Sequence, residues 1–77
     1  MASAREAILQ RLEHHDTQKD GWVRGIDLGH AVAEAFELRK LNYATRKRYT
    51  SAIQWLMKKE KIEYVWRFRI AYYRLPH

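Results

Sequence analysis

The chain lacks the residues that build disulfide-supported folds and thiolate metal sites. It has no cysteine, one proline and three glycines among its 77 residues. The absence of cysteine excludes disulfides and thiolate-bound metals, and it favours a reducing compartment. No apolar run approaches the ~20 residues that cross a bilayer. The start of the chain carries acids and lacks the long apolar stretch of a secretory signal. We therefore expect a soluble, cytoplasmic protein with no membrane partner.

The short length limits the chain to one domain, spanning residues 1–77. A domain of this size buries only roughly 60% of the surface that its unfolded chain exposes, which leaves room for one compact core. Met1 and the Pro76-His77 end favour a complete chain.

Catalytic and metal-binding patterns are also missing from the sequence. His14 and His15 are adjacent and point about 100° apart on a helix, while His30 and His77 are isolated. There is no H-E-x-x-H motif, no P-loop and no paired carboxylate pattern. A chain this small also rarely encloses the ~300 Å³ at which ligand pockets begin. We expect no enzymatic activity, cofactor, metal or small-molecule substrate.

Charge is divided unevenly between the two halves of the chain. Residues 1–38 hold four basic and seven acidic side chains, a net −3, whereas residues 39–77 hold eleven basic and two acidic, a net +9. The basic half also contains eight of the ten aromatic residues. A solubilising surface would normally mix its signs. The segregation therefore favours a polyanionic partner.

Two helices are predicted in the acidic half. Ser3 and Glu6 have the spacing of a capping box, so the first helix should begin there and fray near His14 and His15. A polar turn follows at Asp16–Gly21, and then a short strand at Trp22–Arg24. The second helix is predicted over about Ile26–Leu38, capped by Gly25 or Asp27, with an apolar stripe. That stripe consists of Leu28, Ala31, Val32, Ala35 and Phe36.

The third predicted helix begins after the connection Glu37–Asn42, in which Leu41 should be a buried anchor. Its apolar residues recur at helical spacing and predict a core-facing stripe; they are Tyr49, Ala52, Ile53, Leu56 and Met57. Either Asn42 or Thr45 is the N-cap. With Thr45, the triplet Arg46-Lys47-Arg48 fills the first turn, where the helix dipole disfavours cations. With Asn42 the triplet lies one turn further in, and both alternatives leave it exposed.

The C-terminal segment Ile62–Leu75 changes to a period of two and is rich in β-branched and aromatic residues. Because fourteen residues are long for one strand, a hairpin is expected, with its turn near Arg67-Phe68-Arg69. Its aromatic residues, together with Trp22, should mostly pack the sheet against the helices. They are Tyr64, Trp66, Phe68, Tyr72 and Tyr73.

The order helix, short strand, helix, helix, hairpin resembles the winged helix-turn-helix superfamily. Tyr49, Ile53 and Leu56 stand where that superfamily keeps buried recognition-helix residues, and Ile62 stands where a buried aliphatic leads into the wing. Glu60 stands where a glycine is usual, and no glycine or asparagine marks the wing turn. The resemblance implies an α+β fold with three helices, a short strand and a C-terminal β-hairpin wing.

Residue chemistry on the third helix points to nucleic acid. With the apolar stripe turned inward, a polar row without acids lies on the opposite face; it consists of Lys47, Thr50, Ser51, Gln54 and Lys58. Glutamine can form two hydrogen bonds with adenine, and serine and threonine can bond several bases. A plain solvated face is the alternative for this row.

Double-stranded DNA is therefore the expected partner, bound by a small transcriptional regulator or nucleoprotein-assembly factor, nucleoid-associated in a prokaryote or virus. The base-facing residues would be Lys47, Thr50, Ser51 and Gln54. The phosphate-facing residues would be Arg46, Arg48 and Lys58. Arg67 and Arg69 on the wing would reach a minor groove or a phosphate, or else protect an edge strand from aggregation.

Trp55 suggests a different kind of partner. Helical geometry places it away from the apolar stripe, so it is either an exposed interface residue or packed under the wing. The alternative function is a protein-binding module whose basic face docks an acidic protein in a phage, replication or defence complex, or that self-associates, and Trp55 is the residue that would discriminate it from DNA binding. RNA binding through the hairpin is a third interpretation, without an RNP-like or KH-like motif.

Overall fold

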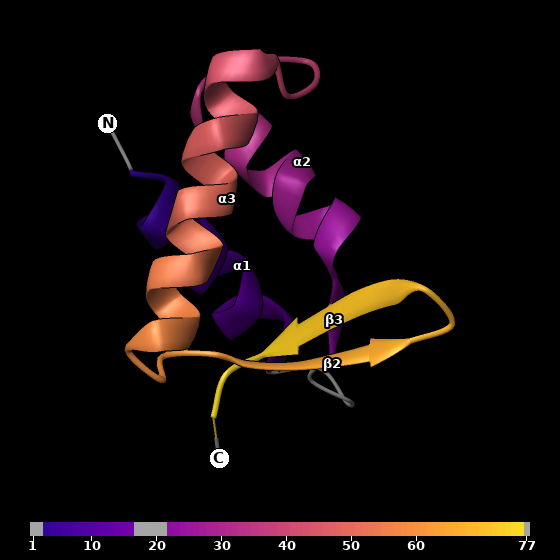
Figure 1. Cartoon of the computed structure of the whole chain (residues 1–77). Helices are drawn as coiled ribbons and strands as arrows, with labels where there is room; N and C mark the ends of the chain where they lie inside the picture. Colours follow the sequence, from indigo (N-terminus) through magenta and orange to yellow (C-terminus); the bar gives the residue numbers. More distant parts are fainter. Residues whose placement is uncertain (1–2, 17–21, 77) are drawn as a thin grey trace.

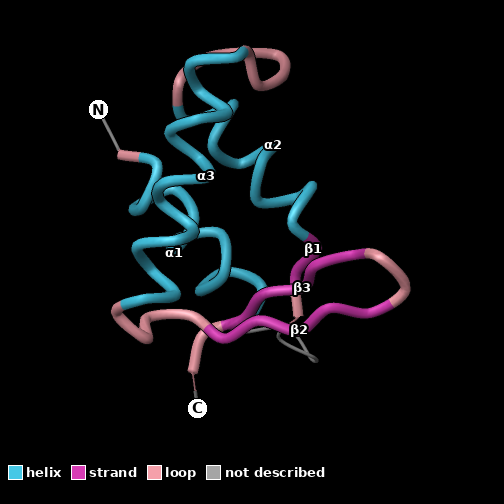
Figure 2. Tube along the Cα trace, viewed as in Figure 1, coloured by secondary structure: helices cyan, strands magenta, loops and turns pink. Residues whose placement is uncertain are grey.

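The computed structural model describes residues 3–16 and 22–76, which form three helices and a three-stranded antiparallel sheet (Figures 1 and 2). The element order is helix, short strand, helix, helix and hairpin, as the sequence predicts. Most of the polar turn predicted at Asp16–Gly21 lies outside the described residues.

The first helix, α1 (Ala4–Asp16), begins at the predicted cap. Ser3 Oγ accepts a hydrogen bond of 3.2 Å from the backbone N–H of Glu6. The helix continues through His14 to Asp16, further than the fraying predicted near the two histidines. Its core-facing side consists of Ala4, Ala7, Ile8 and Leu12.

The second helix, α2 (Gly25–Ala35), is shorter than the predicted range Ile26–Leu38. Its N-cap is Arg24, which makes no side-chain capping bond, so the prediction of Gly25 or Asp27 as the cap is wrong. The Arg24 side chain instead donates from Nε to the Asp27 carboxylate at 3.4 Å. The buried residues of α2 are Leu28, Gly29, Val32 and Ala33, a stripe rotated from the predicted one.

The rotation of α2 is explained by the connection that follows it. Leu41 is half-buried against the core, and its Cδ1 atom would lie 3.3 Å from a Cβ added at Gly29. The small residue at position 29 therefore makes room for the connection, so this side of α2 turns inward.

The third helix, α3 (Tyr43–Lys58), begins at Asn42, whose side chain accepts a hydrogen bond of 2.8 Å from the Thr45 N–H. Asn42 is therefore the N-cap, and Thr45 is buried inside the first turn. The basic triplet 46–48 accordingly lies one turn into the helix. The side of α3 that faces the core consists of Thr45, Ala52, Ile53 and Leu56, with Tyr49 and Met57 half-buried beside them.

Helices α2 and α3 end with the same backbone motif. After α2, Glu37 has φ 59° and the Leu38 N–H donates to the Ala33 carbonyl at 2.8 Å. After α3, Glu60 has φ 57° and the Lys61 N–H donates to the Leu56 carbonyl at 2.8 Å. Glycine is the favoured residue at this left-handed position. A residue with a side chain pays about 1 to 2 kcal/mol of conformational energy there. Position 60 is the one at which the resemblance led us to expect glycine.

The sheet has the strand order β1-β3-β2, formed by β1 (Val23–Arg24), β2 (Glu63–Arg67) and β3 (Ile70–Arg74). Tyr73 in the central strand pairs with Val23 on one side and Tyr64 on the other. Helix α2 packs against β1 and β3, and α1 packs against β3. The outer strand β2 thus extends the sheet beyond the part that the helices cover.

The hairpin turn lies close to where the sequence predicts it. Arg67 pairs with Ile70, so the loop consists of Phe68 and Arg69 alone. Their φ angles are 51° and 65°, which match a type I′ turn. Asn-Gly is the favoured pair there, and each bulkier residue costs about 1 to 2 kcal/mol. A strained turn of two large residues therefore connects the two strands of the hairpin.

The prediction that the hairpin aromatics pack inward is wrong for three of them. Tyr64 is 50% exposed, Trp66 61% and Phe68 92%, whereas Tyr73 is buried. The reason is topological, because Tyr64 and Trp66 belong to an edge strand, β2, and Phe68 to the turn. Figure 1 shows this turn projecting beyond the helices.

Candidate nucleic-acid interface

The outward face of α3 carries the predicted polar row. All five side chains are exposed, on the side of the helix opposite its buried residues; they are Lys47, Thr50, Ser51, Gln54 and Lys58. Arg46 and Arg48 are also exposed and flank this row. Helical periodicity therefore placed the row correctly.

Among the residues that the structure describes, no carboxylate forms an ion pair with a cation of α3. The sixteen residues of this helix include no aspartate or glutamate. The ion pairs Arg24–Asp27 at 3.4 Å and Arg74–Glu63 at 2.9 Å both lie outside α3. The cations of the helix therefore keep their full charge toward solvent.

Aromatic rings position the cations around α3 instead. The Arg48 guanidinium lies 5.6 Å from the ring centroid of Phe36, and Lys47 Nζ lies 5.7 Å from that of Tyr43. On the neighbouring helix, the Arg5 guanidinium lies 3.9 Å from the Trp55 ring. A ring face attracts a cation but leaves its net charge unchanged. The charges are thus held in place and remain able to attract an anion.

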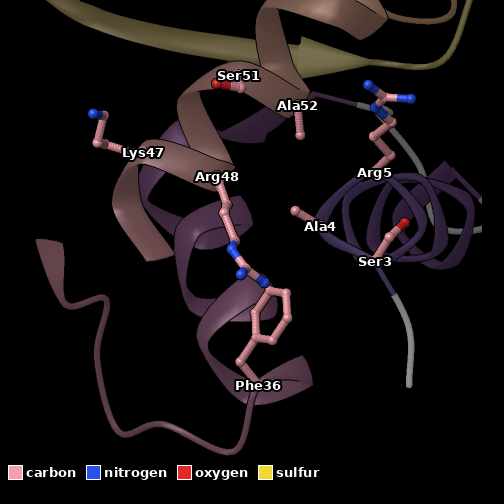
Figure 3. Close-up of a pocket in the computed structure, with 8 residues that line it drawn as sticks. All are labelled: Ser3, Ala4, Arg5, Phe36, Lys47, Arg48, Ser51 and Ala52. Atoms are coloured by element: carbon pink, nitrogen blue, oxygen red, sulfur yellow. The ribbon is translucent and has the colours of Figure 1, made fainter. Parts of the chain in front are cut away.

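A hollow of about 590 Å³ separates the start of α1 from α3. Figure 3 shows Arg48 reaching from α3 toward Phe36, with Ser3 and Arg5 on the opposite side and Lys47 pointing away. The flank of α3 on the α1 side therefore carries guanidinium and hydroxyl groups beside the apolar side chains of Ala4, Phe36 and Ala52.

Arg5 is a residue of this surface that the sequence interpretation missed. Only the fold brings it beside α3, where it covers Trp55. A usable signal was nevertheless present, because Arg5 lies in the first turn of α1, where the helix dipole disfavours a cation.

Trp55 is half-buried and packs against the core, so it is less exposed than an interface residue was expected to be, and its role at an interface stays a prediction. It was expected to be exposed as an interface residue or packed under the wing. Helix α1 covers it instead, with Arg5 on its ring. The guanidinium leaves less of the indole available to a partner.

The opposite flank of α3 faces α2 and the connection. A hollow of about 430 Å³ there is lined by Ile26, His30, Lys40, Arg46 and Thr50, among others. His30 and Lys40 are exposed polar groups that the sequence interpretation did not assign to this surface. Lysine or arginine side chains therefore line both flanks of the polar row.

Tyr49 fixes the position of α3 against α2. Its hydroxyl donates a hydrogen bond of 3.0 Å to the Gly25 carbonyl. Burial, with a smaller effect from Tyr73, raises the pKa of the Tyr49 phenol above its ordinary value. Burial and the nearby Tyr64 likewise raise the pKa of Tyr73. The neutral phenol of Tyr49 thus joins the two helices behind the exposed row.

The hairpin continues the same face of the molecule. Thr50 and Gln54 of α3 line a hollow of about 400 Å³ together with Tyr64 and Trp66 of β2. Beyond Trp66 the strand leads into the turn. Arg67 and Arg69 at that turn are exposed, as predicted. The polar row is therefore adjacent to an aromatic strand that ends at Arg67 and leads to Arg69 in the turn.

The described residues include neither a metal-binding cluster nor a membrane-spanning helix. No group of three or more histidine, aspartate or glutamate side chains there is arranged to hold a metal ion. No helix in that part of the chain has the length and apolar character needed to cross a membrane.

Comparisons of the chain with models of protein families, with curated proteins and with solved structures found no match. Function is therefore inferred from residue chemistry and geometry.

Proposed function

We propose that this protein is a winged helix-turn-helix protein that binds double-stranded DNA, with α3 in the major groove and the hairpin as the wing. It would act as a small transcriptional regulator or nucleoprotein-assembly factor. The element order and the strand order β1-β3-β2 are compatible with this layout.

The observation that carries the proposal is the outward face of α3. It is a sixteen-residue helix without acids, and its exposed polar row has cations on both flanks. A helix fits the major groove of B-DNA, and phosphates border that groove on both sides. The polar row would face the base edges in the groove, and the cations on its two flanks would face the phosphates on either side.

The proposed roles follow from side-chain chemistry. Gln54 is suited to a two-bond contact with adenine, and Lys47, Thr50 and Ser51 to further base edges. Arg46, Arg48 and Lys58 would contact phosphates. On the α1 side, Arg5 would add a further phosphate contact.

The proposal is tested by titrating random-sequence duplex, single-stranded DNA and RNA at several salt concentrations. We expect duplex to bind most tightly, with the logarithm of the association constant falling by about 0.9 per neutralised phosphate against the logarithm of salt. An affinity for duplex that is absent, or unchanged by salt, would reject DNA binding. A preference for RNA would instead favour the third interpretation.

Two substitutions separate base contacts from phosphate contacts. Duplexes enriched from a random pool by the wild-type protein are compared with unselected duplexes. Gln54→Ala should cost about 1 to 3 kcal/mol on the enriched duplexes and little on the others. Arg48→Gln should weaken both and reduce the salt slope by about 1. Arg11→Gln is the matched control, since Arg11 lines a hollow formed by α1 and α2 alone.

The alternative, a module that docks an acidic protein, would be favoured if polyglutamate bound as tightly as duplex at equal salt. Equal losses for Gln54→Ala and Arg48→Gln on every duplex would remove the assignment of base contacts, while leaving phosphate binding in place.

A further inference from the structure

Phe68 is the most exposed of the large apolar residues that the structure describes, with 92% of its surface accessible. It occupies the first of the two turn positions between β2 and β3. Exposing a phenyl ring is unfavourable in water. The question is therefore what the ring contacts when the protein is bound to its partner.

The backbone at this position is unfavourable for phenylalanine as well. Phe68 and Arg69 both have positive φ, in a turn geometry that favours Asn-Gly. Asparagine and glycine would relieve the strain and would also remove the exposed ring. Backbone strain of this kind concentrates at functional sites, and an observed outlier is a reason to look for a function.

The surroundings of the ring suit a negatively charged partner. Arg67 and Arg69 flank Phe68 and are exposed, and residues 64–74 include no acid. Glu63, at the far end of the hairpin, is paired with Arg74 at 2.9 Å. In the sequence, the exposed apolar ring therefore has an exposed arginine on each side.

The turn that carries the ring lies beyond the end of the surface proposed to bind DNA, and Phe68 itself borders a hollow with Trp22, Val65 and Tyr72 on the other face of the hairpin. Tyr64 and Trp66 line a hollow with Thr50 and Gln54 of α3, and the strand then runs to the turn. With α3 in the major groove, the hairpin turn at the end of β2 would reach the neighbouring minor groove. Arginine is attracted there by the negative potential of a narrow groove.

We propose that Phe68 is an apolar wedge that inserts between base pairs in the minor groove and kinks the duplex, while Arg67 and Arg69 contact the groove walls. This inference rests on the proposed DNA binding. Apolar side chains that enter base steps in this way partly unstack them and bend DNA by roughly 20° to 90°. Pyrimidine–purine steps unstack most easily and would be preferred.

A test that requires no knowledge of the target sequence uses one long duplex of mixed sequence held at low force. Its extension is measured as the protein is titrated, and bound protein is quantified by fluorescence anisotropy on short duplex at the same salt. We expect the wild-type protein to shorten the duplex, because each kink reduces its end-to-end length.

Two variants at position 68 separate the wedge from the fold. Phe68→Asn suits the turn better, so its thermal midpoint should equal or exceed that of the wild type. We expect it to bind within about tenfold of wild type, or ~1.4 kcal/mol, and to lose roughly half or more of the shortening. Phe68→Leu, which remains apolar, should retain most of the shortening.

The outcomes distinguish failure of the wedge from failure of the proposed DNA binding. Absence of duplex binding by the wild type would reject both. Binding without shortening, or equal shortening by Phe68→Asn, would reject the wedge alone. A variant that changes only self-association would assign Phe68 to an interface between copies of the chain and likewise reject the wedge.

Discussion

Helices α2 and α3 bury apolar faces in the same core, but their remaining surfaces are built differently. Within Gly25–Ala35 the ionisable side chains are Asp27, His30 and Glu34, with no lysine or arginine. Within Tyr43–Lys58 there are four lysines and arginines and no acid. Both helices bury an apolar face, so burial in the core does not by itself explain this difference. The residues that packing leaves free are the ones that indicate function.

The two helices also differ in how much of each is needed for folding. α2 is short, makes no side-chain cap and contributes two fully buried aliphatics, Leu28 and Val32. α3 is longer and is capped by Asn42, and much of its surface is exposed. We infer that substitutions in α2 act mainly on stability, whereas substitutions on the outward face of α3 act mainly on binding.

The largest effect is expected from a cavity in α2. Leu28→Ala should lower the free energy of unfolding by about 2 to 5 kcal/mol, because it removes a fully buried side chain. A small domain has only about 5 to 15 kcal/mol in total. Urea unfolding followed by circular dichroism should show most of the cooperative transition lost or shifted to low urea.

Thr50→Ala on the exposed side of α3 is the matched variant. Its unfolding free energy should lie within about 0.5 kcal/mol of wild type, while its preference among duplexes changes. The contrast between the helices would fail if Thr50→Ala destabilised the protein as much as Leu28→Ala, or if Leu28→Ala were neutral.

Local sequence patterns predicted the parts of the fold that depend on periodicity. Ile53 and Leu56 are buried because they recur at helical spacing, and that spacing is visible without a structure. The same spacing placed Lys47 and Gln54 outside. The hairpin turn at Phe68 was located from the alternation of its strands and the length of the segment, without a turn dipeptide.

Contacts between distant segments were not predictable in this way. Trp55 was misplaced because its environment is set by Arg5, a residue of another helix. The exposure of Tyr64 and Trp66 depends on β2 being the outer strand, which only strand order determines. The early end of α2 depends on Glu37, whose identity gives no sign of its left-handed backbone.

A smaller effect is expected at the hydrogen bond that joins the two helices. Tyr49→Phe removes the donor to the Gly25 carbonyl and should cost about 0.5 to 1.5 kcal/mol near neutral pH. Tyr43→Phe is the control, because Tyr43 is 79% exposed and makes no such bond in the structure. The difference in unfolding free energy is measured from the urea midpoints of the wild type and the two variants, provided that the three have the same dependence of unfolding free energy on urea concentration.

The pH dependence of the same pair sharpens the comparison. The pKa of Tyr49 is raised on folding, so the fold favours the neutral phenol. The corresponding stability is complete below the unfolded pKa of about 10 and is lost as the pH rises above it. The slope for one phenol is at most about 1.4 kcal/mol per pH unit, and partial exposure reduces it. Tyr49→Phe should lose less stability than wild type between pH ~8 and ~11. An identical alkaline decline in both would show that Tyr49 does not titrate in this range.

The smallest effect is expected where the two helices are most alike, at their C-terminal glutamates. Glu37→Gly and Glu60→Gly should each raise the free energy of unfolding by about 0.5 to 1 kcal/mol, because glycine adopts the left-handed backbone without steric cost. Each also removes an acid from a helix C-terminus, where the dipole disfavours it. Glu34→Gly, inside α2, is the control and should lower stability by about 1 kcal/mol. Similar gains at positions 37 and 60 would show that both helices end under the same backbone strain. A loss at position 60 alone would mean that the Glu60 side chain, beside Lys59 and Lys61, contributes more than its backbone conformation costs.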